Sequence, residues 1–237
     1  MLCGEDYKDL FIDLDDTLYD TRGNAIIALT ELFEWAELGK WFSDAQEFYD
    51  AYWNANIALW GQYTKGEIDR EFLIVERFRR PLSLRMPDPT KEYCLKISDK
   101  FLELCAYKPG VVPGALEVVS YLKEKGYRLH ICSNGFREIQ YKKMRASGLL
   151  DYFDNVILSE DAGINKPAKE YFDYALAQTG AKRETTLMIG DNYYVDVVGA
   201  RNAGIDAMLF RRWDATFEPD EPVKYIVDKL IEIKEIL

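Results

Sequence analysis

Short apolar runs recur along the chain and have the length and composition of buried β-strands. They cover residues 10–12, 129–132, 156–158, 187–189 and 207–210. Segments with helical periodicity lie between most of these runs, and each is followed by a glycine, a residue that commonly ends a helix. They cover residues 115–125, 137–147, 168–179 and 195–203. This alternation predicts a doubly wound, Rossmann-like α/β core in which helices cover both faces of a parallel sheet.

Residues 20–107 differ from the rest because they hold helical patterns and no convincing strand. Four helices are expected there, over residues 24–38, 44–63, 67–79 and 91–104. The block follows the first strand, and open α/β sheets bind ligands at the carboxyl ends of their strands. We therefore expect an α/β core of residues 1–19 and 108–237 and an inserted all-helical cap of residues 20–107, placed to act as a lid.

The 237-residue chain is acidic, with 30 basic and 41 acidic side chains and a net charge of −11. Such a chain binds nucleic acid and anionic membranes poorly, so neither is expected as a partner. No apolar run reaches the roughly 18 residues of a membrane span. Residues 1–9 are too polar for a signal peptide, which predicts a cytoplasmic protein. Nothing in the sequence specifies an oligomeric state, and a monomer is the default expectation.

The cysteine and histidine content narrows the chemistry. The chain has four cysteines, Cys3, Cys94, Cys105 and Cys132. They show no CxxC spacing, so we expect reduced thiols rather than a zinc site. The single histidine, His130, lies within an apolar run and is expected to be a core residue. Serine–histidine and cysteine–histidine hydrolase mechanisms are then excluded. Proton transfer would fall to carboxylates, lysine or tyrosine.

Two aspartates follow the first predicted strand in the segment Asp13-Leu14-Asp15-Asp16-Thr17. Residues i and i+2 of an extended chain share a face, so Asp13 and Asp15 are expected to project together. A cation relieves the repulsion between crowded carboxylates, and Mg²⁺ prefers hard oxygen ligands. One carboxylate could attack phosphorus while the other handles the leaving-group proton. The alternative is an acidic turn after a strand.

A second acidic motif follows the apolar run 187–189. Asp191 stands at the carboxyl end of that predicted strand, as Asp13 does at the first, and Asp196 lies at an expected helix start. Asp191 is a candidate metal ligand. Asp196 could serve the same site, or it could only stabilise the amino end of the helix.

Two further motifs suit an anion. Ser133-Asn134-Gly135 follows a predicted strand, and a hydroxyl beside backbone amides in a glycine turn can cradle phosphate oxygens. Lys166 precedes Pro167 in the loop before a helix and could neutralise a phosphoryl oxygen. A common turn and a surface lysine are the respective alternatives. All four motifs fall near the carboxyl ends of successive strands, where side chains converge.

These motifs together resemble those of the haloacid dehalogenase-like hydrolase superfamily, and the likeness covers nearly the whole chain. The residues that fit the four motifs, in order, are Asp13 with Asp15, Ser133, Lys166, and Asp191 with Asp196. The helical block 20–107 looks like that family's mobile cap. Segments 59–63, 133–136 and 172–176 look most like the pyrimidine 5′-nucleotidase group.

The resemblance implies a role for each acidic residue. Asp13 would be the nucleophile and a Mg²⁺ ligand, and Asp191 would be a second direct ligand. Asp15 would be the general acid and then the base, with its backbone carbonyl on the metal. Asp196 would assist the metal site. The side chains at positions 13, 15 and 191 are accordingly expected to meet around one divalent ion.

Other residues would bind the phosphoryl group. The resemblance implies this role for Ser133 and Lys166, with supporting contacts from Thr17 and the Asn134 amide. An acid at position 15 argues for an oxygen leaving group, because a halide leaves without a proton.

The sequence therefore predicts a Mg²⁺-dependent phosphatase that forms an aspartyl-phosphate from a small phosphorylated metabolite. A nucleoside 5′-monophosphate is the favoured substrate, and Trp60 and Tyr63 could stack on its base, although ordinary packing in the cap is the alternative. A sugar-phosphate phosphatase or a phosphomutase would use the same residues. A catalytically silent binding protein is a third possibility, but such proteins usually lose a motif acid, and none is missing here.

Overall fold

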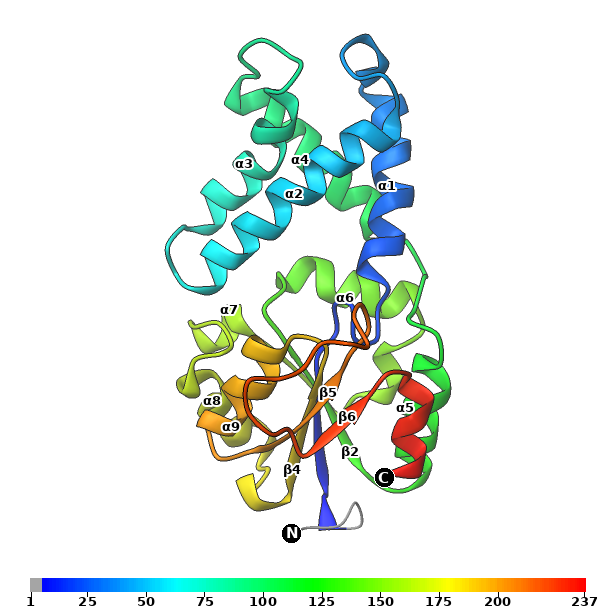
Figure 1. Cartoon of the computed structure of the whole chain (residues 1–237), viewed down its shortest axis with the longest axis vertical. Coiled ribbons are helices and arrows are strands. Elements are labelled where there is room, and N and C mark those ends of the chain that lie inside the picture. The colour runs from blue at the N-terminus through cyan, green and yellow to red at the C-terminus, as the bar shows by residue number, and fades with distance from the viewer. Residues whose placement is uncertain (1–5) are drawn as a thin grey trace. The chain divides into compact units, whose positions relative to one another are not determined.

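The computed structural model describes residues 6–237, which fall into two compact units (Figure 1). Of these residues, one unit comprises 6–21 and Pro109–Leu237, and the other comprises Arg22–Lys108. The first contains the β-sheet, and the second is built from helices. Cys3 lies outside the described residues. Within them, no helix has both the length and the hydropathy that crossing a membrane requires.

A six-stranded parallel sheet forms the centre of the first unit. Its strands are β1 (Asp9–Ile12), β2 (Arg128–Ser133), β3 (Asn155–Leu158), β4 (Thr186–Gly190), β5 (Asp206–Phe210) and β6 (Tyr225–Val227). Their spatial order is β3-β2-β1-β4-β5-β6, so β1 lies between β2 and β4. This arrangement confirms the predicted α/β fold. The short edge strand β6 was not predicted, because no helical segment separates it from β5 and it lies outside the strand–helix alternation.

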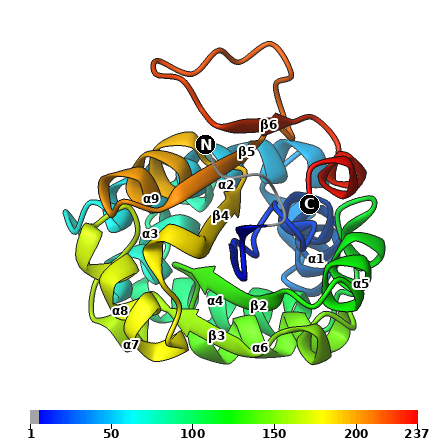
Figure 2. The same cartoon turned by 90° about the horizontal axis from the view of Figure 1, so that it is seen from below.

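Alternating side chains of the central strands supply two hydrophobic cores, one on each face of the sheet. Leu10 and Ile12 face a core that includes α5, whereas Phe11 faces one that includes α8. Figure 2 shows α5 and α8 on opposite sides of the sheet. The helices of this unit are α5 (Ala115–Glu124), α6 (Arg137–Ala146), α7 (Ser159–Ala162), α8 (Lys169–Thr179) and α9 (Gly199–Asn202). A π-helical turn, Tyr193–Val198, precedes α9, and a 3₁₀ segment, Leu230–Glu235, follows β6.

The helical unit contains the four predicted helices. They are α1 (Thr21–Trp35), α2 (Ala45–Thr64), α3 (Arg70–Leu82) and α4 (Lys91–Cys105). The side chains of Asp44, Asp69 and Thr90 accept hydrogen bonds from backbone N–H groups of the first turns of α2, α3 and α4. These N-caps fix where each helix begins.

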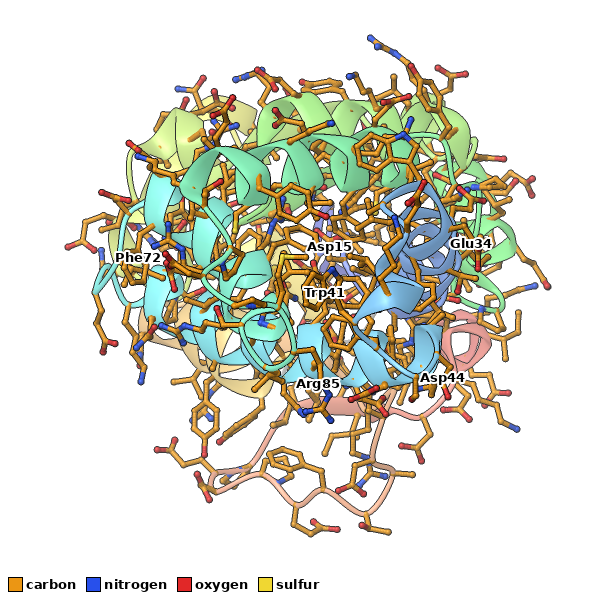
Figure 3. The ribbon with its side chains drawn as sticks, turned by 90° about the horizontal axis from the view of Figure 1, so that it is seen from above. Asp15, Glu34, Trp41, Asp44, Phe72 and Arg85 are labelled. Atoms are coloured by element: carbon orange, nitrogen blue, oxygen red, sulfur yellow. The ribbon has the colours of Figure 1, made fainter. Side chains whose placement is uncertain are left out.

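Aromatic side chains form much of the core of the helical unit. Tyr52, Phe78 and Phe101 are buried, with ring centroids 5.1–5.5 Å apart. Other aromatic residues remain outside that core. Trp41 and Phe72, both labelled in Figure 3, are 41% and 44% exposed. Core packing therefore accounts for some, but not all, of the aromatic residues in this segment.

A buried polar network joins three strands of the sheet. The carboxylate of Asp9 contacts His130 Nε2 at 3.0 Å and accepts from Arg128 Nη2 at 2.7 Å. Asn155 Nδ2 lies 3.1 Å from His130 Nδ1 and donates to it, so Nε2 carries the imidazole proton. Burial lowers the pKa of His130, although Asp9 opposes the shift. His130 is therefore a core residue, as the sequence predicts, and its burial favours the neutral imidazole.

Acidification should destabilise the protein partly through His130. Because the folded chain lowers the pKa of this imidazole, the unfolded chain binds the proton more readily, and stability is lost as the pH falls past about 6.5. We expect the free energy of unfolding to decrease less in His130→Gln than in the wild type between about pH 7.5 and about pH 5.5. Urea unfolding at both pH values measures this difference. Equal decreases in the two proteins would contradict the assignment.

Candidate active site

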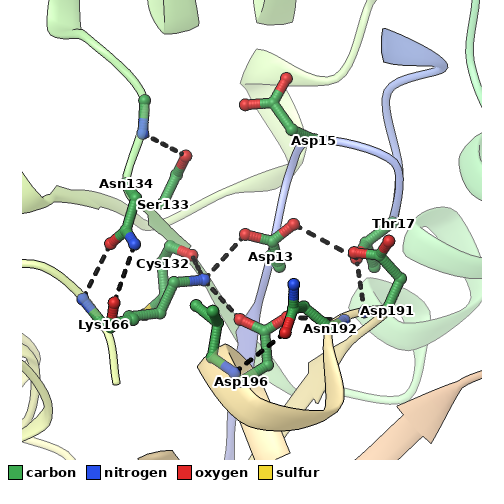
Figure 4. A network of polar contacts seen from close by, with 12 residues as sticks. Asp13, Asp15, Thr17, Cys132, Ser133, Asn134, Lys166, Asp191, Asn192 and Asp196 are labelled. Carbon is green, nitrogen blue, oxygen red and sulfur yellow. Dashed lines mark hydrogen bonds and ion pairs between the residues drawn. The ribbon is translucent and has the colours of Figure 1, made fainter. Parts of the chain in front are cut away.

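The motif residues gather at the carboxyl edge of the sheet (Figure 4). Asp13 directly follows β1, Ser133 ends β2, and Asp191 directly follows β4. The backbone N–H of Asp13 donates to the carbonyl of Ile189 at 2.9 Å, which extends the pairing of β1 and β4 to the point where the carboxylates emerge. Lys166 approaches from the loop before α8. The parallel register thus brings together residues that lie far apart in sequence.

Three carboxylates and one ammonium form the centre of this site. Asp13, Asp191 and Asp196 each offer an oxygen atom within 4.8 Å of the others. Lys166 Nζ donates to Asp13 Oδ1 at 2.8 Å and to Asp196 Oδ1 at 2.6 Å. It also donates to the carbonyl of Cys132 at 2.6 Å, and its side chain is 1% exposed. Lys166 is therefore a buried site residue and not the surface lysine that was the alternative.

The charges of this centre are unbalanced without a further cation. Burial raises the pKa of Asp13 to about 7, although Lys166 opposes the shift. Burial and the neighbouring carboxylates of Asp13 and Asp196 raise the pKa of Asp191 well above its usual range. Burial disfavours the charged form of Lys166, but Asp13 and Asp196 raise its pKa above the usual value and keep it protonated. The site holds three carboxylates and one ammonium group. A divalent cation that prefers oxygen ligands would balance the remaining negative charge.

Thr17 links the two acidic motifs. Its hydroxyl lies 3.3 Å from Asp13 Oδ2 and 3.1 Å from Asp191 Oδ1, both of which can accept its proton. The Thr17 hydroxyl oxygen also accepts a hydrogen bond from the backbone N–H of Asp191 at 3.1 Å. Thr17 is fully buried and so holds the loop after β1 against the loop after β4.

Asp196 is fixed by close packing as well as by its ion pair. Its Oδ2 accepts from the backbone N–H of Asn192 at 3.1 Å. A Cβ atom at Gly190 would lie 2.3 Å from the same oxygen, so only glycine fits at the end of β4. Asp196 also forms the ion pair with Lys166 described above. Its role is therefore more than stabilising the start of a helix.

Asn134 joins the second and third motifs. Its side-chain Nδ2 donates to the carbonyl of Lys166 at 2.9 Å, and its Oδ1 accepts from the N–H of Lys166 at 2.8 Å. The side-chain amide therefore orients the lysine loop. Any contact of Asn134 with a phosphoryl group would come from its backbone.

Asp15 departs from the arrangement expected from the sequence. Its side chain is not part of the carboxylate cluster and points away from it in Figure 4. Oδ1 accepts from Thr21 Oγ1 at 2.7 Å and from Lys143 Nζ at 2.6 Å, and Oδ2 accepts from Gln140 Nε2 at 2.6 Å. Burial opposes ionisation, but Lys143 and these hydrogen bonds hold the pKa of Asp15 below its usual value. Asp13 and Asp15 thus share a loop but occupy different electrostatic environments.

Sequence reasoning missed three residues near these motifs. Gln140 and Lys143 lie three positions apart on α6 and so share a helix face directly after the Ser133-Asn134-Gly135 turn. That spacing was a usable signal. Arg212, which donates to the carbonyl and the carboxylate of Asp16 at 3.0 Å, comes from the loop after β5, and nothing in its local sequence indicates this contact.

Comparison with known proteins agrees with this site. A sequence model described as haloacid dehalogenase-like hydrolase matches residues 7–204. The chain is 30% identical to the Bacillus subtilis protein YfnB, described as a HAD-hydrolase, over 98% of this chain and 95% of that one. It is 32% identical to the pyrimidine 5′-nucleotidase PynA of Streptococcus pneumoniae, over 86% of this chain and 84% of that one. A glyceraldehyde 3-phosphate phosphatase of Methanothermobacter thermautotrophicus is 30% identical, with 97% and 99% covered.

The fold comparison gives the same result. The crystal structure of magnesium-bound YfnB superposes with a TM-score of 0.86 at 29% identity, covering 97% of this chain and 98% of that one. The chain belongs to the haloacid dehalogenase-like hydrolases, as the four motifs indicate. It is an enzyme of the phosphatase type within that family, whose relatives include nucleotidases and sugar-phosphate phosphatases.

Replacing Lys166 should destabilise the fold when no divalent cation is present. Lys166→Met leaves the buried carboxylates of Asp13 and Asp196 without their ammonium partner. Removing one member of a buried ion pair typically costs about 3–5 kcal/mol. Urea unfolding in a chelating buffer measures the loss.

Lys169→Met is the matched control for this prediction. Lys169 pairs with Asp173 on the surface of α8, and its side chain is 53% exposed. Exposed pairs contribute little, so a much smaller loss is expected. Equal losses for the two variants would show that Lys166 has no special role in balancing the buried charges.

Proposed function

We propose that the protein is a Mg²⁺-dependent phosphatase that transfers the phosphoryl group of a small metabolite to Asp13 and then to water. The main support is the cluster of Asp13, Asp191 and Asp196 with Lys166 at the carboxyl edge of the sheet. Within this cluster, the carboxylate of Asp13 contacts Lys166 through Oδ1 and Thr17 through Oδ2. We propose Asp13 as the nucleophile on this placement.

Two proton transfers accompany the proposed reaction. A carboxylate oxygen of Asp13 forms a bond to phosphorus as the bond from phosphorus to the ester oxygen breaks. Asp15, whose contacts favour its ionised form in the free protein, would take up a proton when the substrate binds and give it to that leaving oxygen. Asp15 then takes a proton from the water that attacks the aspartyl-phosphate, which restores the Asp13 carboxylate and releases inorganic phosphate. The side chain of Asp15 lies outside the carboxylate cluster, so it is not needed as a metal ligand and can serve the leaving group.

The remaining motif residues would hold the metal and the phosphoryl oxygens. We assign Mg²⁺ to the carboxylates of Asp13 and Asp191 and the backbone carbonyl of Asp15, with Asp196 assisting. The bound ion would supply charge neutralisation for the phosphoryl group. Ser133, the backbone N–H of Asn134, and Lys166 would contact phosphoryl oxygens, which carry the charge of the transition state.

A phosphate ester suits this site better than an organic halide does. Several solved structures with the same fold are dehalogenases, but they are at most 22% identical to this chain and indicate the fold alone. A departing halide needs no proton, whereas an alkoxide does. The presence of a second carboxyl group at position 15, two residues after Asp13, therefore favours an oxygen leaving group.

Two substrate classes have specific support. We favour a nucleoside 5′-monophosphate, because pyrimidine 5′-nucleotidases of Streptococcus pneumoniae and Escherichia coli are each 32% identical to the chain. A sugar phosphate is the second candidate, since a glyceraldehyde 3-phosphate phosphatase is 30% identical over nearly the whole chain. We further propose that the helical unit is a cap that contributes to this choice. Trp60 and Tyr63, which pack edge to face in α2, are candidates for contact with a base.

Phosphate release from a substrate panel tests the proposed function. We expect the wild type with Mg²⁺ to release inorganic phosphate from nucleoside 5′-monophosphates or sugar phosphates. Asp13→Asn keeps the size of the side chain but removes the nucleophile, so turnover should fall by more than about a thousandfold. Isomerised sugar phosphate without net release of phosphate would indicate a mutase instead. A folded wild type that is inert toward the whole panel would support a silent binding protein.

Removing Asp191 should alter the response to metal. Asp191→Ala deletes a proposed ligand and leaves the nucleophile in place. We expect half-maximal activity to require at least about tenfold more Mg²⁺. The measurement is the initial rate of phosphate release against Mg²⁺ concentration, with Asp173→Ala on α8 as a carboxylate control. An unchanged titration would remove Asp191 from the metal site.

A further inference from the structure

The side chain of Gln140 joins two parts of the site that the proposed function uses separately. It is fully buried on α6. Its Nε2 donates to Asp15 Oδ2 at 2.6 Å and to Ser133 Oγ at 2.7 Å. An amide nitrogen carries two hydrogens, so both contacts can form at once. A single side chain thus links the proposed acid to the proposed phosphate-binding hydroxyl.

These contacts fix the direction of the Ser133 hydroxyl. Ser133 Oγ accepts from Gln140 Nε2 and also from the backbone N–H of Gly135, at 3.0 Å. A hydroxyl has two acceptor lone pairs and one donor hydrogen. With both lone pairs occupied, the hydrogen must point toward some other acceptor. A phosphoryl oxygen is an acceptor of this kind.

The contacts also fix the orientation of Asp15. Gln140 holds Oδ2, while Thr21 and Lys143 hold Oδ1. The two carboxylate oxygens are thereby distinguished, and rotation of the group would break at least one hydrogen bond. Lys143 is on the same face of α6 as Gln140, and its side chain is 12% exposed.

Packing around the amide leaves it little freedom. A Cβ atom at Gly135 would lie 2.3 Å from Gln140 Nε2 and 2.4 Å from its Cδ. The turn after β2 therefore needs glycine, because the glutamine side chain occupies the space beside it. A Cβ atom at position 135 would displace the amide from the position in which it contacts Asp15 and Ser133.

We propose that Gln140 is a positioning residue for the phosphatase reaction, acting through Asp15 and Ser133. It directs the carboxyl group toward the leaving oxygen and the hydroxyl toward the phosphoryl group, and it keeps the two in a fixed relation. The proposal rests on the proposed function, in which Asp15 protonates the leaving oxygen.

Two aryl phosphates distinguish this role from a purely structural one. Phenyl phosphate and p-nitrophenyl phosphate have similar shapes, but p-nitrophenolate departs with little need of a proton. Misplacing the acid should therefore slow the phenyl ester more. We expect Gln140→Met to lower kcat/KM for both esters through Ser133 and to lower it further for phenyl phosphate. The ratio between the esters should change by on the order of tenfold.

A double-mutant comparison tests whether the effect passes through Asp15. In an Asp15→Asn background the acid is already absent, so Gln140→Met should leave the ratio between the two esters unchanged. Lys142→Met is the control, because Lys142 is an exposed neighbour on the same helix. It should match the wild type with both esters. Thermal unfolding checks that each variant is folded, and Gln140→Asn, which shortens the reach of the amide, replaces Gln140→Met if that variant does not fold.

The possible results separate this inference from the proposed function. A wild type that hydrolyses neither ester with Mg²⁺ contradicts the proposed function itself. An active wild type whose ratio between the esters is the same in Gln140→Met overturns the positioning role. The positioning role is also overturned if Gln140→Met changes the ratio between the esters equally in the wild type and in Asp15→Asn.

Discussion

Three carboxylates share one buried ammonium at the carboxyl edge of the sheet, and the rest of the site depends on this imbalance. Asp13, Asp191 and Asp196 lie within 4.8 Å of one another, and Lys166 contacts only two of them among the contacts described. Burial raises the pKa of Asp13 to about 7, although Lys166 opposes the shift. A divalent cation would favour the ionised forms of Asp13 and Asp191, whose pKa values burial raises. An ionised Asp13 is the form that can attack phosphorus.

The fold creates this crowding through the parallel register and then holds it with short-range contacts. Strands β1, β2 and β4 are neighbours that end at the same edge, so their following residues converge. Thr17 ties the loop after β1 to the loop after β4. Asn134 ties the loop after β2 to the loop that carries Lys166. Glycine at position 190 leaves room for the carboxylate of Asp196. These features keep the carboxylates and the lysine close together despite the repulsion among the carboxylates.

Much of this arrangement could be predicted from the sequence because it depends on local patterns. Apolar runs located five of the six strands, and acidic residues directly after them located Asp13 and Asp191. Strand β6 escaped prediction because no helical segment precedes it, so the strand–helix alternation does not point to it. The side-chain direction of Asp15 also escaped prediction. The spacing of two residues places Asp13 and Asp15 on one face, but only the tertiary fold brings Thr21, Gln140 and Lys143 to the second carboxylate.

The central claim is that the carboxylate cluster is a binding site for a divalent cation. A crystal structure of the protein with Mn²⁺, which anomalous scattering identifies, tests it most directly. We predict one strong anomalous peak about 2.0–2.2 Å from oxygen atoms of both Asp13 and Asp191, close to the distances that Mg²⁺ prefers. Full occupancy of the cation elsewhere, with no peak between these two carboxylates, would contradict the claim.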